Sequence, residues 1–290
     1  MTLRIHAALF AVALLFSANF IVSKIAMREL APLSFAWLRV AGSTLLLWFV
    51  ARKELLPRGE WRRMALFSIL AVVINQTLFL SGLAFTTVQV AAILITSIPV
   101  FVAGVAIALG QERASASRIL GIALACAGAL LVVGGEVFTG SGRSLLGAVL
   151  ILTNCLSYSI YLVISKPDMA RLSPRLVVAR MFLIGMVLML PIAAPALSRE
   201  RWSSISAMAW LSLLLVILGP TVAAYLLQAW ALRYADSSLV AAYTYVQPVL
   251  ATLLGRVFFA EEIRATVVVA ALMIFSGVWI VSRKMERRVT

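Results

Sequence analysis

Stretches of about twenty apolar residues, separated by short charged clusters, follow one another along the whole chain. Ten can be counted within 290 residues, of which 63% are hydrophobic and 12% charged. A helix needs about 20 mostly apolar residues to cross a bilayer, and no soluble core could absorb so much apolar surface. The pattern therefore predicts an all-α polytopic membrane protein with ten transmembrane helices. The predicted spans are residues 5–27, 33–51, 62–84, 87–109, 117–135, 145–165, 175–195, 206–231, 238–258 and 265–283.

The basic residues predict how these spans are oriented, because cytoplasmic loops carry an excess of Lys and Arg. The richer of the two alternating sets of loops holds Arg4, Arg52, Lys53, Arg58, Arg62, Arg63, Arg113, Arg118, Lys166, Arg171, Arg175, Arg233, Arg283, Lys284, Arg287 and Arg288. The opposite set holds Arg28, Arg143, Arg199, Arg201 and Arg264. We therefore expect both termini in the cytoplasm. The net charge of +14 reflects this bias and not nucleic-acid binding.

Sequence landmarks recur in the same order 149 residues apart. The aligned pairs are Trp61 with Trp210, Pro99 with Pro248, Glu112 with Glu261 and Gly128 with Gly277. A shift of 142 residues aligns the first span with the sixth in the same way. Each half has five spans, an odd number, so the two copies would face opposite sides of the membrane, as in many secondary transporters. We expect two five-helix repeats, residues 1–139 and 140–290, with a substrate site between them near the midplane.

The end of the fourth span and the start of the fifth resemble a known family. Residues 110–113 and the later Gly128 are similar to the Gly-Glu-Arg segment and late glycine of EamA-type transporters, of the drug/metabolite transporter superfamily. Arg39 is similar to a family arginine in the second span. The second copy, residues 260–277, lacks the glycine and arginine around its acid. The resemblance implies a ten-helix fold, cytoplasmic termini and export or exchange of small metabolites. Among the branches of the family, the chain most resembles the aromatic and neutral amino-acid exporters of the YddG type.

Polar and aromatic side chains inside the spans indicate where a solute binds. Hydrogen-bonding groups in hydrocarbon are costly unless they find partners or line an aqueous cavity. The candidate substrate-binding residues are Asn19, Phe20, Asn75, Gln76, Phe79, Ser97, Asn154, Tyr158, Tyr225, Gln228 and Tyr245. Thr244 and Gln247 are further polar residues of the ninth span. For each residue alone, hydrogen bonding between helices is the alternative, but for the set a cavity is favoured.

Two arginines and two prolines also lie within the spans. A guanidinium at Arg39 or Arg180 could bind a substrate carboxylate or act in a gate. The alternative is snorkelling, or donation to carbonyl groups of a neighbouring helix. Pro99 and Pro248 each remove a helix hydrogen bond and are candidate hinges, and a tolerated kink is the alternative.

The positions of the acidic residues and the absence of several motifs exclude some classes of function. All eleven Asp and Glu fall in loops or at span ends. This argues against a membrane-embedded proton carrier and a cationic substrate, and favours a neutral or zwitterionic solute. A phosphate-binding GxxxxGK[ST] loop is missing, and a single histidine leaves no metal set and no Ser-His-Asp triad. The sequence therefore predicts a secondary transporter that works by alternating access without ATP, and neither an enzyme nor a cofactor or metal protein.

The substrate class stays open at this point. Neutral or aromatic amino acids are the first expectation, and efflux of other small solutes or drugs is the alternative. Two alternatives from other functional classes are a lipid scramblase and an intramembrane enzyme. The expected partners are a small-molecule substrate and the lipid bilayer of a bacterial inner membrane, and the expected state is a monomer or weak oligomer.

Overall fold

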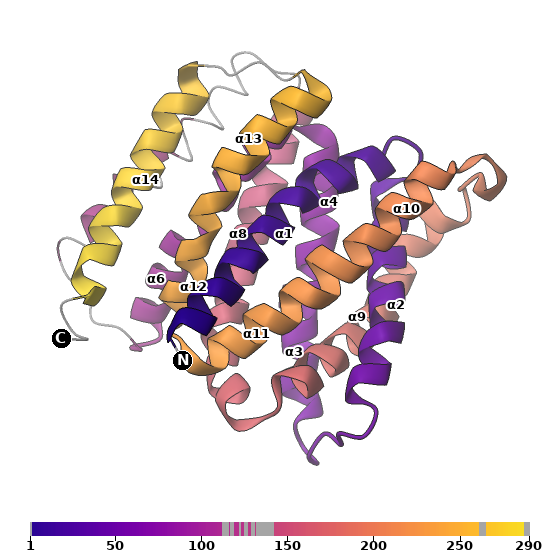
Figure 1. Cartoon of the computed structure of the whole chain (residues 1–290), viewed down its shortest axis with the longest axis horizontal. Coiled ribbons are helices and arrows are strands. Elements are labelled where there is room, and N and C mark those ends of the chain that lie inside the picture. Colours follow the sequence, from indigo (N-terminus) through magenta and orange to yellow (C-terminus); the bar gives the residue numbers. More distant parts are fainter. Residues whose placement is uncertain are drawn as a thin grey trace.

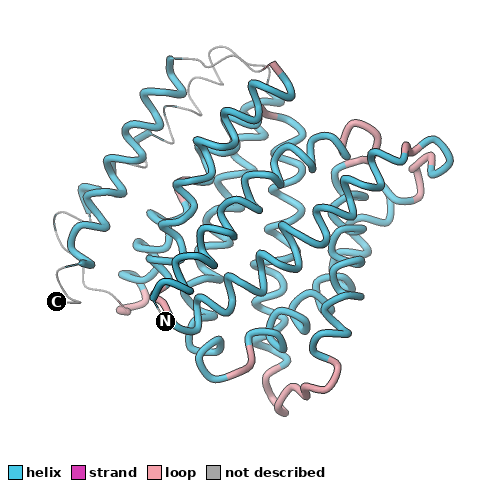
Figure 2. The backbone as a smooth tube through the Cα atoms, viewed as in Figure 1, coloured by secondary structure: helices cyan, strands magenta, loops and turns pink. Residues whose placement is uncertain are grey.

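The computed structural model describes residues 2–111, 142–260 and 265–286, with scattered positions between 116 and 131. These residues form helices joined by short loops at the two ends of a bundle, and no strand occurs among them (Figure 2). The α-helices are α1 (Thr2–Ala26), α2 (Pro32–Ala51), α3 (Trp61–Ser68), α4 (Asn75–Phe85), α5 (Val88–Ile95), α6 (Ile98–Ala108), α8 (Gly142–Arg171), α9 (Pro174–Leu197), α10 (Ala207–Val216), α11 (Ala224–Tyr234), α12 (Ser237–Ala242), α13 (Val246–Phe259) and α14 (Ala265–Glu286).

Within these described residues, eight helical runs are long and apolar enough to cross a bilayer. They are Leu3–Ala26, Pro32–Ala51, Trp61–Phe85, Val88–Ala108, Gly142–Arg171, Pro174–Leu197, Ala207–Tyr234 and Ser237–Phe259. Large apolar side chains point outward from them, Phe49 and Val187 among the most exposed, as a lipid-facing surface requires. The chain is therefore a multi-pass membrane protein.

The limits of these runs agree closely with eight of the predicted spans, except that α8 continues to Arg171, well beyond the predicted end at residue 165. α14 contains a shorter apolar stretch, Val268–Gly277. The predicted span 117–135 falls largely outside the described residues, as do Glu112 and Glu261. The count of ten helices thus stays a prediction.

Four of the spans are interrupted, and the interruptions correspond between the two halves. A π-helical segment, η1 (Ile69–Ile74), joins α3 to α4, and a second one, η3 (Ile217–Ala223), joins α10 to α11. A turn at residues 96–97 separates α5 from α6, and the 3-10 turn η4 (Tyr243–Tyr245) separates α12 from α13. Each interruption recurs close to the spacing of 149 residues that relates the sequence landmarks.

The two prolines follow these breaks. Pro99 lies at the start of α6, and Pro248 lies in the first turn of α13. Backbone N–H groups in the first turn of a helix have no intrahelical acceptor, so proline costs no hydrogen bond there. The expected loss of a hydrogen bond inside a continuous helix was therefore wrong, because the break precedes each proline.

Helix pairs from the two halves pack closely. α2 packs against α9, and α4 packs against α8. At the second contact a Cβ atom on Gly147 would lie 2.9 Å from the carbonyl oxygen of Gly82, and one on Gly82 would lie 2.9 Å from that of Gly147. Two glycines thus let the two backbones approach, as is common between membrane helices. In Figure 1, α2 and α9 lie on one side of the bundle and α14 on the other, and the start of α1 and the end of α14 lie at the same end.

Polar contacts tie the halves together at one end of the bundle. The Glu29 carboxylate accepts hydrogen bonds from the backbone N–H of Ser206 at 2.6 Å and from its hydroxyl at 2.7 Å. Glu200 accepts from the backbone N–H of Ala31 at 2.8 Å. We call these four residues the Glu29 clasp. Ser206 lowers the pKa of Glu29, because its N–H and hydroxyl stabilise the ionised carboxylate.

A second set of contacts ties the halves at the opposite end. Asp168, whose side chain is 1% exposed, lies 2.7 Å from Arg63 and 2.9 Å from Arg171. Arg171 also pairs with Glu60 at 2.7 Å. We call these four residues the Asp168 clasp. Both ends of the molecule therefore carry polar links between residues of the first and second halves.

Candidate functional site

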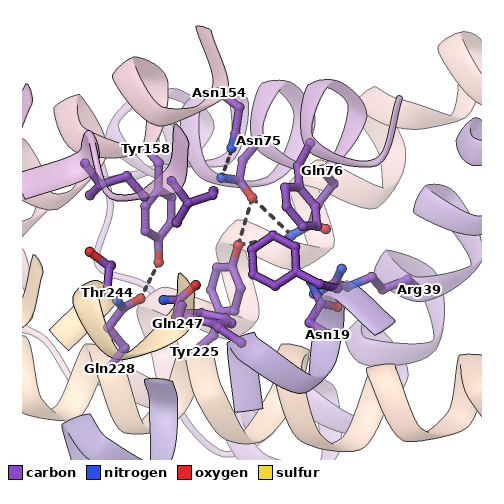
Figure 3. Close-up of a pocket in the computed structure, with 15 residues that line it drawn as sticks. Asn19, Arg39, Asn75, Gln76, Asn154, Tyr158, Tyr225, Gln228, Thr244 and Gln247 are labelled. Atoms are coloured by element: carbon purple, nitrogen blue, oxygen red, sulfur yellow. Dashed lines mark hydrogen bonds between the residues drawn. The ribbon is translucent and has the colours of Figure 1, made fainter. Parts of the chain in front are cut away.

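A cavity of about 60 Å³ lies within the bundle, bordered by spans from both halves. A water molecule takes up about 30 Å³ in the liquid, so the cavity has room for about two waters. Its walls come from α1, α2, α4, α5, α6, α8, α11, η4 and α13 (Figure 3). The lining residues are Phe16, Asn19, Phe20, Arg39, Asn75, Gln76, Phe79, Ile95, Ile98, Asn154, Tyr158, Tyr225, Gln228, Thr244 and Gln247.

Most of the predicted substrate-binding residues line this cavity. These are Asn19, Phe20, Asn75, Gln76, Phe79, Asn154, Tyr158, Tyr225 and Gln228. Thr244 and Gln247, which stood out only as polar residues of a span, line it as well. Phe16, Ile95 and Ile98 were missed, because an apolar side chain in an apolar span gives no signal of its own.

Ser97 and Tyr245 do not line the cavity. Their hydroxyl groups are buried without a hydrogen-bond partner. The Tyr245 ring instead packs edge-on against Phe275 of α14, with ring centroids 5.8 Å apart. Tyr245 lies next to a lining residue, Thr244, but on the other side of the turn η4.

Hydrogen bonds connect the cavity residues of the two halves. Asn75 donates to Asn154 at 2.6 Å, and Gln76 donates to the hydroxyl of Tyr225 at 3.0 Å. The Tyr225 hydroxyl donates in turn to the carbonyl oxygen of Ala71 at 3.1 Å. Ala71 belongs to η1, where the wider π-helical turn alters the usual pairing of carbonyl groups. Figure 3 shows the bonds that Asn75 and Gln76 make with Asn154 and Tyr225.

Aromatic rings form much of the remaining wall. Phe20 and Phe79 meet edge to face with centroids 5.5 Å apart, and Tyr158 and Tyr225 do so at 6.3 Å. The hydroxyl of Tyr158 donates to the side-chain oxygen of Gln228. The cavity thus offers ring faces together with amide and hydroxyl groups, a combination usual for small-molecule sites.

Arg39 supplies the one formal charge among the lining residues. Its side chain is 2% exposed, and its Nε donates to the hydroxyl of Thr221 at 2.7 Å. Its Nη1 has no hydrogen-bond partner, and no carboxylate of the described residues lies within ion-pair distance of it. A buried charge without a partner is costly, so this guanidinium is poised for an anionic group.

Arg180, the second predicted arginine, lies elsewhere. Its Nη2 donates to the backbone carbonyl of Glu54 at 2.9 Å, and its guanidinium lies over the ring of Trp48 at 5.5 Å. It does not line the cavity. Among the residues that the structure describes, no group of three or more His, Cys, Asp or Glu side chains is placed to hold a metal ion.

Apolar spans around a buried polar cavity of solute size define the class of membrane transporters for small solutes. The chain belongs to the EamA-like transporter family, which matches residues 3–134 and again residues 145–283. The segment 110–113, Gly128 and Arg39 had already suggested this family from the sequence.

Curated relatives agree with the assignment to this family, and a solved structure shares the fold. An uncharacterized transporter of Archaeoglobus fulgidus is 25% identical over 298 residues, which cover 99% of this chain and 100% of that protein. The uncharacterized transporter YoaV of Bacillus subtilis is 23% identical over 283 residues, 96% of each chain. A solved crystal structure, 17% identical, has the same fold with a TM-score of 0.69 over 96% of both chains.

Proposed function

We propose that the protein exports or exchanges small neutral or zwitterionic metabolites, foremost amino acids, by alternating access without ATP. The observation that carries the proposal is the charge of the cavity. Its lining residues include amides, phenols and one guanidinium, but no carboxylate. A cationic solute would find no counter-charge there, whereas a zwitterion finds a positive group, hydrogen-bond acceptors and ring faces for its ammonium.

The size of the cavity bears on which amino acids bind. A cavity of about 60 Å³ favours the smallest amino acids, such as glycine and alanine, over larger ones. An aromatic amino acid, the cargo expected from the YddG-type resemblance, would require the rings of Phe20 and Phe79 to move apart. Small neutral amino acids are therefore the first substrates to test, and aromatic ones the second.

The proposed mechanism uses two inverted repeats, residues 1–139 and 140–290. Matching contacts in the two halves support it. Lys24 at the end of α1 donates to the carbonyl oxygen of Thr86 at 2.9 Å. Lys166, its counterpart in α8, pairs with Asp236 at the corresponding loop of the second half. The family also matches the chain twice, once in each half.

Alternating access requires points at which the spans can bend. The breaks between α5 and α6 and between α12 and α13 lack the regular hydrogen bonding of a helix, and Pro99 and Pro248 follow them. In the proposed mechanism these breaks are the hinges, and the spans rock around the central cavity. The distribution of basic residues supports cytoplasmic termini in a bacterial inner membrane.

Counterflow in liposomes tests this function. Purified protein is reconstituted without nucleotide, and exchange of labelled glycine, alanine, serine, leucine and phenylalanine is measured. We expect the small neutral amino acids to exchange. Asn75→Ala and Gln228→Ala should lower the initial rate by about tenfold, the effect of one lost hydrogen bond to a polar group. Thr153→Ala, at an exposed position of α8, is the control.

Three outcomes would contradict the proposal. The substrate class is wrong if no amino acid exchanges. A requirement for ATP rules out the mechanism. Accumulation driven by an imposed pH gradient would mean that the protein couples transport to protons in spite of a cavity without carboxylates.

A further inference from the structure

The buried Arg39 is held by a hydroxyl group from the other half of the chain. Its Nε donates to the Oγ1 atom of Thr221 at 2.7 Å, and Thr221 is 0% exposed. The same hydroxyl donates its proton to the carbonyl oxygen of Val216 at 2.7 Å, five residues earlier in the chain. Since a hydroxyl has a single proton, Thr221 faces Arg39 only as an acceptor.

The π-helical segment η3 sets this geometry. An interval of five residues is the spacing of a π-helical turn, and the segment contains Pro220, which has no N–H to donate. The carbonyl of Val216 is therefore available to Thr221. The local structure of the second half thus fixes an acceptor opposite an arginine of the first half.

Anchoring one edge of a guanidinium determines where its other donors point. The group is planar with five N–H donors in a rigid arrangement. With Nε bound to Thr221, the Nη1 atom stays buried without a partner beside the cavity. A carboxylate matches such donors well and can bind two of them at once.

Another residue that lines the cavity, Gln76, carries an unpaired acceptor. The amide nitrogen of Gln76 donates to the Tyr225 hydroxyl at 3.0 Å and to the side-chain oxygen of Asn75 at 3.3 Å. These two bonds fix which way the amide faces. Its oxygen, Oε1, is buried and has no hydrogen-bond partner. Gln76 and Arg39 lie toward the same side of the cavity in Figure 3.

We propose that Arg39 and Gln76 form a two-point site for an α-amino acid, and that Thr221 is the positioning residue for its carboxylate end. The carboxylate binds the free N–H groups of Arg39, and the ammonium donates to Oε1 of Gln76. This inference rests on the proposed function and names the atoms that recognise the solute. Because Arg39 and Thr221 belong to different halves, the carboxylate site is complete only while the halves keep this arrangement.

Variants of Thr221 test the positioning role. Thr221→Val keeps the shape of the side chain and removes the acceptor, whereas Thr221→Ser keeps the hydroxyl. The matched control is Thr153→Val, which removes an exposed hydroxyl that donates within its own helix at 2.9 Å. In L-alanine counterflow we expect Thr221→Val to raise the half-saturation concentration about tenfold and to lower the maximal rate much less. Thr221→Ser should stay within about twofold of the native protein.

A second readout asks which end of the solute is recognised. Thermal unfolding of the purified protein is followed with L-alanine, with L-alaninamide, which lacks the carboxylate, and with propionate, which lacks the ammonium. L-alanine should stabilise the native protein most. Thr221→Val should lose the preference for L-alanine over L-alaninamide, and Gln76→Leu the preference for L-alanine over propionate.

The outcomes separate this inference from the proposed function. If the native protein exchanges no amino acid, both fail. If it exchanges L-alanine while Thr221→Val keeps the native half-saturation concentration and preference, the positioning role alone is overturned. Equal stabilisation of the native protein by L-alanine and L-alaninamide overturns the carboxylate site. Should Thr221→Val fail to fold, Thr221→Ala provides the same comparison.

Discussion

Gln76 and Tyr225 hydrogen-bond to each other at 3.0 Å although they stand 149 residues apart in the chain. The same interval relates Trp61 to Trp210. Two residues that a repeat makes equivalent can touch only near the axis that relates the copies. In the proposed inverted repeat that axis passes through the cavity, so a bound solute contacts both halves at once.

Tyr158 lines the cavity and Tyr245 does not. Loss of the hydroxyl group should therefore have different effects at the two positions. Tyr158→Phe leaves the side-chain oxygen of Gln228 without its donor, which should cost about 1–3 kcal/mol in the free energy of unfolding and reduce transport. Tyr245→Phe removes a buried hydroxyl that has no partner and should be neutral or stabilising. Thermal unfolding and counterflow measure both. Equal losses of transport would place Tyr245 on the substrate path after all.

The contact between α4 and α8 should not tolerate a methyl group. In Gly147→Ala the new Cβ would lie 2.9 Å from the Gly82 carbonyl oxygen and 3.0 Å from the Cβ of Phe85, so the helices must separate at a cost of about 1–3 kcal/mol. Gly104→Ala in α6 is the control, because nothing lies within 4 Å of its Cβ position. Unfolding in denaturant should show a loss for Gly147 alone, and equal effects would contradict the close approach.

Asp168 and Asp236 form separate ion pairs near the same end of α8, and the two should contribute differently to the free energy of unfolding. Asp168, whose side chain is 1% exposed, lies between two arginines, whereas Asp236 is 77% exposed and pairs with Lys166. Asp168→Asn should lower the free energy of unfolding by about 1–3 kcal/mol, because it removes the charge-assisted contacts of a buried acceptor with Arg63 and Arg171, although Arg171 keeps its pair with Glu60. Asp236→Asn should change it by less than about 1 kcal/mol. The reverse order in thermal unfolding would show that the Asp168 clasp contributes little.

The Glu29 clasp should weaken in acid. Ser206 lowers the pKa of Glu29 below its ordinary value of 4.5, so the folded state binds this proton less readily than the unfolded chain. The resulting stabilisation is present above that value and is lost as the pH falls through the lower, folded pKa. The difference in melting temperature between native protein and Glu29→Gln should therefore be constant near neutral pH and vanish in acid. A difference that persists in strong acid would exclude the ionised carboxylate as its source.

Hydropathy was sufficient to locate the described spans, because the length of an apolar stretch reflects the thickness of the bilayer. It failed at the end of α8, where the helix continues through Asp168 and Arg171. The charges of these residues predicted a loop, but Asp168 is paired with arginine in the folded protein and stays in the helix. The π-helical segments had no recognisable signal, since their residues are as apolar as those of the flanking helix.

Polarity within apolar spans was sufficient to find most of the cavity. It could not distinguish Thr244 from Tyr245, because the direction of neighbouring side chains depends on the turn η4 and not on residue type. Thr221 was missed although it follows Pro220 inside an apolar span. A polar residue beside an intramembrane proline is the signal that could have revealed it.

The π-helical segments make the position of the proposed binding residues depend on the number of residues in a span. A π-helical turn amounts to one residue inserted into an α-helix, and each residue of an α-helix advances the chain by about 100°. Deleting a single residue from η1 would restore regular helix and rotate Asn75 and Gln76 away from the cavity, while the hydropathy of the span stayed almost the same. Transport would then be lost because Asn75 and Gln76 no longer face the cavity. Every proposed binding residue would still be present in the sequence.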